Sequence, residues 1–257
     1  MDITLKKVGE IKNMAEACPW EEKLAFAEIL LNDERNSVKK IGEKMIKDAL
    51  NRVKEEARLE QMWQIEDEIR QMGYEVVCGC DEVGRGPLAG PVVAAAVILP
   101  RDVKLWGIND SKKISEKKRE ELDAQIRDQA IAIGIAEVSA QVIDEVNILE
   151  ASRLAMVQAV RNLEKKVNFV IIDGLENPRM REWPQKAIVK GDGKCISIAA
   201  ASIVAKVYRD KLMVELAKKY PQYGLEENKG YGTQKHYAAL KEFGPCEIHR
   251  RSFDLKL

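Results

Sequence analysis

The sequence contains no long hydrophobic run. Its longest nearly uncharged stretch, from Pro87 to Pro100, is too short to cross a bilayer and contains Gly90 and Pro91, so we expect a buried strand there and no membrane span. The first residues lack a basic segment followed by the apolar core of a secretory signal, which favours a cytoplasmic protein. The five cysteines agree with that location, because an odd number suits free thiols better than a disulfide framework.

Net charge is also absent, since 42 basic side chains balance 42 acidic ones. The net charge therefore gives no evidence of the global basic field that is typical of nucleic-acid-binding proteins. A nuclease whose acids serve as metal ligands can still have a low net charge and keep a basic surface for phosphates. The composition does not exclude such an enzyme.

Histidine is scarce, and the candidate zinc ligands are poorly spaced. His236 and His249 are too far apart for a helical zinc motif and neither has a nucleophile signature beside it, so we assign them packing or solvent-exposed roles. Cys78 and Cys80 have no second cysteine pair nearby and are expected to share one face of a strand. A zinc site is not expected.

The chain divides into two regions of different pattern. Residues 1–72 hold two of the 16 glycines, and their apolar residues recur at three- and four-residue steps until Gly73, which predicts a helical N-terminal extension. Packing of this extension on the main domain is favoured over an independent functional module. Residues 73–257 carry short strand-like runs that later alternate with helices, which predicts an α/β domain with a mixed sheet flanked by helices. The expected strands are residues 74–80, 92–99, 131–138, 169–173 and 187–189, and the clearest helices are 151–163 and 196–219.

Acidic residues follow several of the expected strands. Asp81 and Glu82 come directly after the first strand, and Asp173 comes after the apolar run that begins at Phe169. Asp192 lies between a short strand and an alanine-rich helix. Clustered carboxylates repel one another unless cations lie between them, and oxygen ligands without His or Cys suit Mg²⁺ or Mn²⁺. The pattern therefore indicates a site where two divalent ions promote hydrolysis of a phosphodiester. On spacing alone this indication is weak, because an acid after a strand is often just a turn residue.

A glycine-rich turn follows the first two acids. Gly84 and Gly86 flank Arg85, and two glycines around a basic residue let backbone amides approach a ligand closely. A tight turn into Pro87 is the alternative. The glycine spacing matches neither the dinucleotide-binding fingerprint nor the phosphate-binding P-loop, so those nucleotide-binding functions are not expected.

The assembled string resembles a known family. Residues 79–97, GCDEVGRGPLAGPVVAAAV, are similar to the opening signature of bacterial ribonuclease HII, a type 2 ribonuclease H. The remaining blocks of that family are resembled, in order, by NDSKK at 109–113, IDG at 172–174, KGD at 190–192, AAASIVAKVYRD at 199–210, KGYGT at 229–233 and HRRSF at 249–253. The resemblance covers residues 74–253, with the N-terminal segment outside it.

The resemblance implies a fold and a reaction. The fold is a ribonuclease H-like, five-stranded mixed sheet flanked by helices, with further helices toward the C-terminus. The enzyme is a hydrolase that cuts the RNA strand of RNA/DNA hybrids, and cuts 5′ of single ribonucleotides in duplex DNA, leaving 3′-hydroxyl and 5′-phosphate ends. It serves ribonucleotide removal and RNA primer processing, and we expect a monomer. Two divalent ions, Mn²⁺ or Mg²⁺, are held in such enzymes by four acids, which match Asp81, Glu82, Asp173 and Asp192.

The resemblance also implies roles in substrate binding. Gly84, Arg85 and Gly86 match the motif that reads the ribose 2′-hydroxyl, the group that distinguishes RNA from DNA. Tyr231 matches a tyrosine that packs on the adjoining deoxyribose, and Lys112 matches a phosphate-contacting position. Other basic candidates, for which ordinary solvated charge is the alternative, are Lys206, Arg209, Arg250 and Arg251.

Two competing functions remain. A ribonuclease HIII on the same fold cuts longer hybrids but not single embedded ribonucleotides, and the Gly84 to Gly86 turn with Tyr231 favours ribonuclease HII instead. A noncatalytic duplex-binding module would tolerate loss of the acids, yet all four candidate positions carry an acidic residue.

Overall fold

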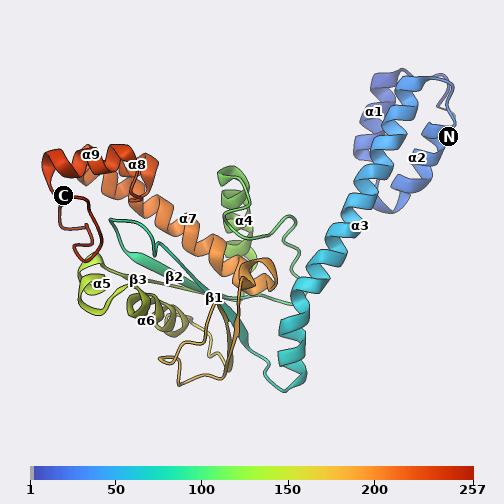
Figure 1. Cartoon of the computed structure of the whole chain (residues 1–257). Helices are drawn as coiled ribbons and strands as arrows, with labels where there is room; N and C mark the ends of the chain where they lie inside the picture. Colours follow the sequence, from blue (N-terminus) through green and yellow to red (C-terminus); the bar gives the residue numbers. More distant parts are fainter. Residues whose placement is uncertain (1–2) are drawn as a thin grey trace. The chain divides into compact units, whose positions relative to one another are not determined.

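The computed structural model describes residues 3–257 (Figure 1). It contains two compact units, of which the first runs to Glu60 and the second from Gln61 to Leu257. The expected boundary between residues 72 and 73 therefore falls inside the second unit, because the last turns of the long helix α3 (Asn36–Gln71) belong to that unit. Among the described residues, no helix combines the length and the apolar character needed to span a membrane.

The first unit is helical, as predicted. It comprises α1 (Val8–Ala17), the short 3₁₀ helix η1 (Trp20–Glu22), α2 (Lys23–Leu31) and the first part of α3. Its small core is formed by buried apolar side chains of all three α-helices, among them Ile11, Ala27, Leu30, Val38 and Met45.

The second unit is built on the predicted five-stranded mixed sheet. The strands are β1 (Val77–Val83), β2 (Val92–Ile98), β3 (Ala132–Val138), β4 (Phe169–Asp173) and β5 (Gln185–Ile188), in the spatial order β3-β2-β1-β4-β5. The first three strands pair antiparallel, whereas β1 with β4 and β4 with β5 pair parallel. β1 is therefore the central strand, with an antiparallel neighbour on one side and a parallel neighbour on the other.

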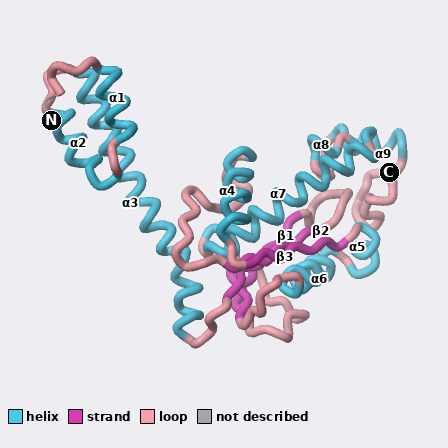
Figure 2. The backbone as a smooth tube through the Cα atoms, turned by 180° about the vertical axis from the view of Figure 1, so that it is seen from behind, coloured by secondary structure: helices cyan, strands magenta, loops and turns pink. Residues whose placement is uncertain are grey.

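Helices cover both faces of this sheet (Figure 2). α6 (Ile148–Arg161) packs on one face and α7 (Ile196–Lys219) on the other. Cys78 and Cys80 point to the α6 side, in one cluster with Ala155 and Met156, which confirms that they share a face. The remaining helices are α4 (Glu116–Gln129), α5 (Ala140–Val146), η2 (Gly191–Gly193), η3 (Pro221–Tyr223), α8 (Leu225–Asn228) and α9 (Gln234–Phe243).

Two glycines allow the helices to lie directly on the strands. A Cβ atom placed on Gly79 of β1 would lie 2.3 Å from the carbonyl carbon of Ser197 in α7. A Cβ atom on Gly134 of β3 would lie 2.0 Å from the carbonyl oxygen of Ala159 in α6. Both contacts involve helix backbone, which cannot move aside as a flexible side chain can. Only glycine therefore permits this separation between helices and sheet.

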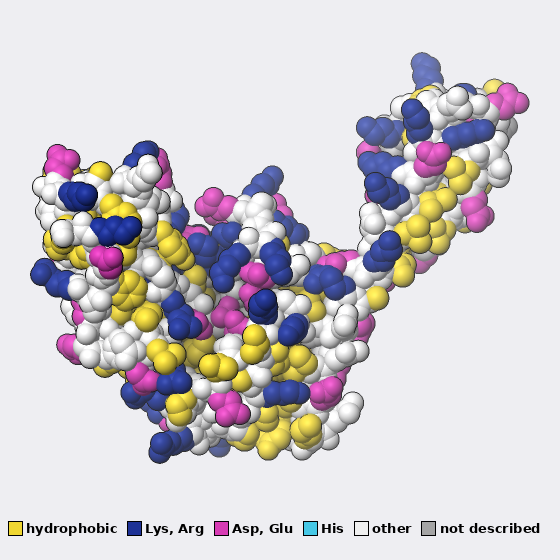
Figure 3. Space-filling view, viewed as in Figure 1, with side chains coloured by type: hydrophobic (Ala, Val, Ile, Leu, Met, Phe, Trp, Pro, Cys, Tyr) yellow, Lys and Arg dark blue, Asp and Glu magenta, His cyan; other side chains and the backbone are white. Residues whose placement is uncertain are grey.

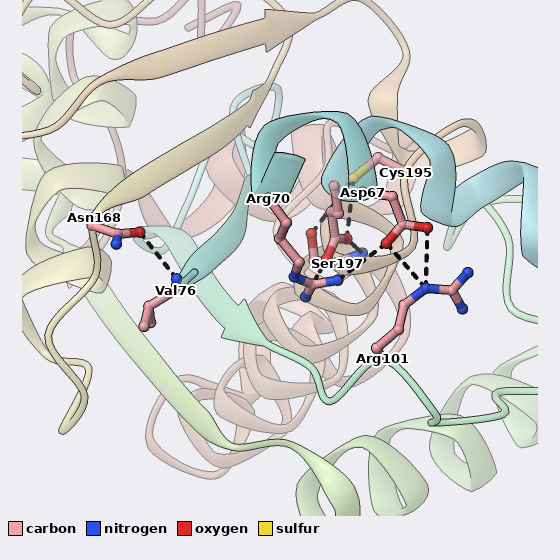
Figure 4. A network of polar contacts seen from close by, with 8 residues as sticks. Asp67, Arg70, Val76, Arg101, Asn168, Cys195 and Ser197 are labelled. Carbon is pink, nitrogen blue, oxygen red and sulfur yellow. Dashed lines mark hydrogen bonds and ion pairs between the residues drawn. The ribbon is translucent and has the colours of Figure 1, made fainter. Parts of the chain in front are cut away.

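A polar network joins the end of α3 to the start of α7 within the second unit (Figure 4). The carboxylate of Glu66 is completely buried and accepts hydrogen bonds from the Ser197 backbone N–H (3.2 Å) and the Cys195 thiol (3.5 Å). Arg70 approaches the other carboxylate oxygen at 3.4 Å. Burial raises the pKa of Glu66, and these partners oppose that rise. Glu66 thereby supplies the N-terminal cap that α7 lacks from its own flanking residue.

Candidate active site

Strand pairing brings the first acids together. Cys80 of β1 pairs with Ile172 of β4 in parallel register, so the next residues, Asp81 and Asp173, are neighbours at the same edge of the sheet. The predicted position of the acids after the first strand was wrong, because β1 extends through Asp81 and Glu82 to Val83 along its antiparallel partner β2. Only the parallel pairing with β4 stops before the acids. Asp81 is thus held by a strand that continues beyond it.

The acids raise one another's pKa values. Burial, Glu82 and Asp173 together hold the pKa of Asp81 well above its usual range. Burial also raises the pKa of Glu82 to about 7, with a further contribution from Asp173. Arg85, whose Nη1 lies 3.4 Å from Oε1 of Glu82, opposes this rise. The carboxyls are therefore crowded enough to retain protons when no cation separates them.

Asp192 joins the group through the turn that carries it. The backbone N–H of Gly191 donates a 2.6 Å hydrogen bond to Oδ1 of Asp173, which links η2 to the end of β4. Asp192 is buried, and its pKa is raised by burial and by the carboxyls of Asp110 and Asp173, while Lys112 lowers it. All four predicted acids thus interact electrostatically, and Lys112 lies within range of the same cluster.

Three residues near the acids were not singled out from the sequence. A hydrogen bond from Ser202 lowers the pKa of Asp81, and the hydroxyl of Ser202 lies 3.0 Å from that of Ser111. Asp110, beside Ser111, interacts with Asp192. The available signals were a serine within the alanine-rich run of α7 and the NDSKK block itself, but neither reveals which side chains face the acids.

The glycine turn and Tyr231 lie side by side. A Cβ atom placed on Gly86 would lie 3.6 Å from Cε1 of Tyr231, so the tyrosine ring flanks the turn. Arg85 and Gly86 are exposed, as is Tyr231 at 43%. Gly84 is buried, has a φ of +89°, and would bring a Cβ atom within 2.2 Å of Nε of Arg209. This position therefore requires glycine.

The basic candidates divide into two groups. Arg209 and Arg250 are completely buried and donate to backbone carbonyls, so both the phosphate-contact and the solvated-charge interpretations are wrong for them. Lys206 forms a 2.6 Å ion pair with Asp210, and Arg251 is exposed. Figure 3 shows Lys and Arg side chains interspersed with acidic ones on the face of the second unit that carries α4.

The donor set suits hard divalent cations. The clustered side chains provide carboxylate oxygens without His or Cys, and these oxygens are the ligands that Mg²⁺ and Mn²⁺ prefer. Across residues 3–257, no three potential metal-ligating side chains already form a complete binding cluster. The acids are therefore a candidate donor set whose electrostatic coupling is evident in the raised pKa values of Asp81 and Glu82.

The raised pKa of Glu82 leads to a prediction about the stability of Glu82→Gln. Because the pKa of Glu82 is raised from 4.5 to about 7, its favourable contribution to folding is complete below pH 4.5 and is lost as pH rises through 7. In the absence of divalent ions, we expect the Gln variant to be more stable than the parent by ~1–3 kcal/mol at pH 8, with little difference at pH 4.5. Denaturation in EDTA at both pH values measures this effect, and equal stability at pH 8 would contradict it.

Comparison with known proteins identifies the family of the chain. The family model described as Ribonuclease HII matches residues 78–256, and the one described as Ribonuclease HII N-terminal domain matches residues 7–70. A ribonuclease HII from Bacillus anthracis is 49% identical over 246 residues, which cover 96% of this chain and 95% of the relative.

Solved structures give the same family. The ribonuclease H2 of Pyrococcus horikoshii is 28% identical with a TM-score of 0.58, covering 70% of this chain and 94% of that chain. The ribonuclease HII of Archaeoglobus fulgidus, solved in a complex with PCNA, is 27% identical with a TM-score of 0.60, covering 69% and 95%. The family models, the relatives and the fold together establish that this chain belongs to the ribonuclease HII family and is a ribonuclease H endonuclease.

Proposed function

We propose that the chain hydrolyses the RNA strand of RNA/DNA hybrids and cuts on the 5′ side of single ribonucleotides in duplex DNA, leaving 3′-hydroxyl and 5′-phosphate ends. The observation that carries this proposal is the placement of an acid cluster beside an exposed glycine turn and an exposed tyrosine. Such an enzyme acts as a monomer in the cytoplasm, in ribonucleotide removal and RNA primer processing.

The acids are the proposed ligands of two divalent ions, Mg²⁺ or Mn²⁺. Bound there, the ions would supply an activated water and stabilise the charge that develops on the phosphodiester. The chain's own contribution is to hold the acids in place through the central strands. Asp81 is fixed by β1, Asp173 by β4, and Asp192 by the hydrogen bond from Gly191 to Asp173. Ser202 positions Asp81 from α7.

Residues around the acids are the proposed readers of the substrate. The turn at Gly84, Arg85 and Gly86 brings backbone close to the ribose, where hydrogen bonding to the 2′-hydroxyl identifies a ribonucleotide whatever its base. Tyr231 packs on the deoxyribose that follows it, and its position beside Gly86 supports joint recognition of an RNA-to-DNA junction. Lys112 contacts a phosphate near the acids.

The proposal is tested by comparing two substrates, a duplex with one ribonucleotide and a hybrid with a long RNA strand, each with Mg²⁺ or Mn²⁺. We expect cleavage of both, with the single-ribonucleotide product ending in 3′-hydroxyl on the DNA side. Cleavage of the hybrid alone would favour a ribonuclease HIII type of specificity, and cleavage of neither would favour a binding module.

The tyrosine gives a sharper version of this test. Tyr231→Ala should lower kcat/KM on the single-ribonucleotide duplex by at least about tenfold more than on the long hybrid, because the lost ring contact serves the junction. Phe243→Ala, which removes another exposed ring, 55% exposed and at the end of α9, should leave the ratio between the two substrates unchanged. An unchanged ratio in the Tyr231 variant would remove this residue from the proposed recognition site.

A further inference from the structure

The completely buried side chain of Arg250 donates hydrogen bonds to the backbone of the Gly84 to Gly86 turn. Nη1 of Arg250 donates to the Arg85 carbonyl at 2.9 Å, and Nη2 donates to the Gly84 carbonyl at 2.5 Å. Nε and Nη2 both donate to the Gly90 carbonyl, at 3.0 and 2.9 Å. The planar guanidinium therefore joins both ends of the segment from Gly84 to Gly90.

The backbone around Arg250 is attached to the same segment. The Arg250 N–H donates to the Leu88 carbonyl, and the Gly90 N–H donates to the Ile248 carbonyl, each at 2.8 Å. A further bond of 2.8 Å runs from the Leu88 N–H to the Gly230 carbonyl, next to Tyr231. The turn, the C-terminal segment and the tyrosine loop are thus one hydrogen-bonded unit.

The two histidines form a relay that ends on Tyr231. Nδ1 of His236 lies 2.9 Å from the Tyr231 carbonyl, and Nε2 of His236 lies 3.1 Å from Nε2 of His249. Nδ1 of His249 lies 3.0 Å from the backbone nitrogen of Cys246. Both rings are buried, so the expected solvent-exposed alternative was wrong and the packing alternative was right.

The hydrogen-bond partners at the two ends of the relay determine which ring nitrogens carry protons. The Tyr231 carbonyl can only accept, so Nδ1 of His236 carries the proton and Nε2 of a neutral His236 accepts. The Cys246 N–H can only donate, so Nδ1 of His249 accepts and Nε2 of a neutral His249 donates. Nε2 of His249 therefore donates to Nε2 of His236, and each neutral ring has a single possible tautomer.

We propose that His249 and Arg250 are adjacent positioning residues, with His249 acting through His236 to fix Tyr231 and Arg250 fixing the Gly84 to Gly86 turn. The role rests on the proposed function for the meaning of the two exposed elements. None of the three anchoring side chains touches nucleic acid, because His249 is 2% exposed and His236 and Arg250 are fully buried. They set the distance between the reader of the 2′-hydroxyl and the ring on the next sugar.

The relay is tested by a matched pair of substitutions. In His236→Asn, the side-chain amide N–H takes the place of Nδ1 and keeps the bond to Tyr231. In His236→Gln, the amide group takes the place of Nε2, keeping the bond from His249 and losing the one to Tyr231. Each variant loses one hydrogen bond, so their thermal stabilities should be similar.

Two readouts separate positioning from mere stability. Amide hydrogen exchange in residues 229–233 should be about fivefold to tenfold faster in the Gln variant than in the Asn variant, as expected for one lost hydrogen bond. The Gln variant should also raise KM for the single-ribonucleotide duplex with kcat little changed, and the Asn variant should restore KM. Equal exchange and equal KM in the two variants would overturn the relay.

The arginine anchor has its own control. Arg250→Lys keeps the charge but lacks the planar fork that reaches two sets of carbonyls, so preference for the ribonucleotide duplex over an all-DNA duplex in binding should fall about tenfold. Arg251→Lys changes the exposed neighbour and should leave that preference intact. An unchanged preference in folded Arg250→Lys would overturn this half of the proposal, and the histidine pair tests the other half if that variant does not fold.

Failure of the anchor and failure of the proposed function give different results. Hydrogen exchange needs no substrate, so the His236 pair reports on the anchor even if the chain shows no ribonucleotide preference. If Tyr231→Ala leaves substrate preference unchanged while the exchange difference is present, the anchor stands and the assigned role of Tyr231 fails. If exchange is equal while Tyr231→Ala alters preference, the proposed function stands and the relay fails.

Discussion

Replacing Asp81 or Asp173 by Asn is expected to lower the single-turnover cleavage rate by at least ~10³-fold. Each change removes a negative charge from the proposed ion ligands with little change of shape. Binding of an RNA/DNA hybrid should remain within about twofold, because phosphate contacts come from other residues. Single-turnover kinetics and fluorescence anisotropy on the same substrate measure the two quantities.

A stability measurement and a matched control test whether the lost activity reflects unfolding or the removal of any acid. Asp81→Asn removes a carboxyl whose pKa is raised by burial and by neighbouring acids, so the folded variant should be at least as stable as the parent without divalent ions. Asp102→Asn, at an exposed acid in the turn after β2, should leave cleavage unchanged. Turnover within tenfold of the parent in Asp81→Asn or Asp173→Asn would refute the assignment of that residue.

Gly79→Ala is expected to cause the largest loss of stability, at least ~3 kcal/mol or failure to fold. The added methyl group would lie 2.3 and 2.4 Å from backbone atoms of Ser197 and Ile198 at the start of α7. Relief requires α7 to move away from β1, which would also disturb the position of Ser202 relative to Asp81. Chemical denaturation followed by circular dichroism measures the loss.

The control for this prediction is a glycine with free space around it. A Cβ atom at Gly9, in α1 of the first unit, meets nothing within 4 Å, so Gly9→Ala should not destabilise the chain and should favour its helix slightly. A stability of Gly79→Ala within about 1 kcal/mol of the parent would show that helix and sheet are not packed as closely as described.

Local patterns in the sequence predicted much of the fold. The helix expected at residues 196–219 is observed with those bounds. The helix expected at 151–163 is observed as α6 at 148–161, preceded by Asn147, whose side chain accepts from the N–H groups of Leu149 and Glu150. These features depend on residues close together in the chain, where spacing and capping chemistry are informative. The extent of β1 was less predictable, because its last three residues are strand only through pairing with β2.

The parts of the site that the sequence did not reveal depend on contacts between distant residues. Arg250 reaches carbonyls of residues about 160 positions away, and nothing local distinguishes it from the exposed Arg251. Glu66 is similar, since its partners Cys195 and Ser197 lie more than 120 positions further along. Its capping role at α7 could not be read from the amphipathic pattern of the N-terminal region. Burial of a charged group against backbone is a property of the fold, which residue type alone does not indicate.

The order of the strands determines how the site would come apart. β1 carries Asp81 and has hydrogen-bonded neighbours on both sides, whereas β5 is one of the two edge strands and is only half-buried along its length. Asp192 follows that edge. Local opening at β5 breaks a single ladder, so it requires less free energy than displacing β1 from the centre of the sheet. We therefore expect local opening to break the hydrogen bond from Gly191 to Asp173 and displace Asp192 before Asp81 and Asp173 lose their register, so that the acids can regroup without global refolding.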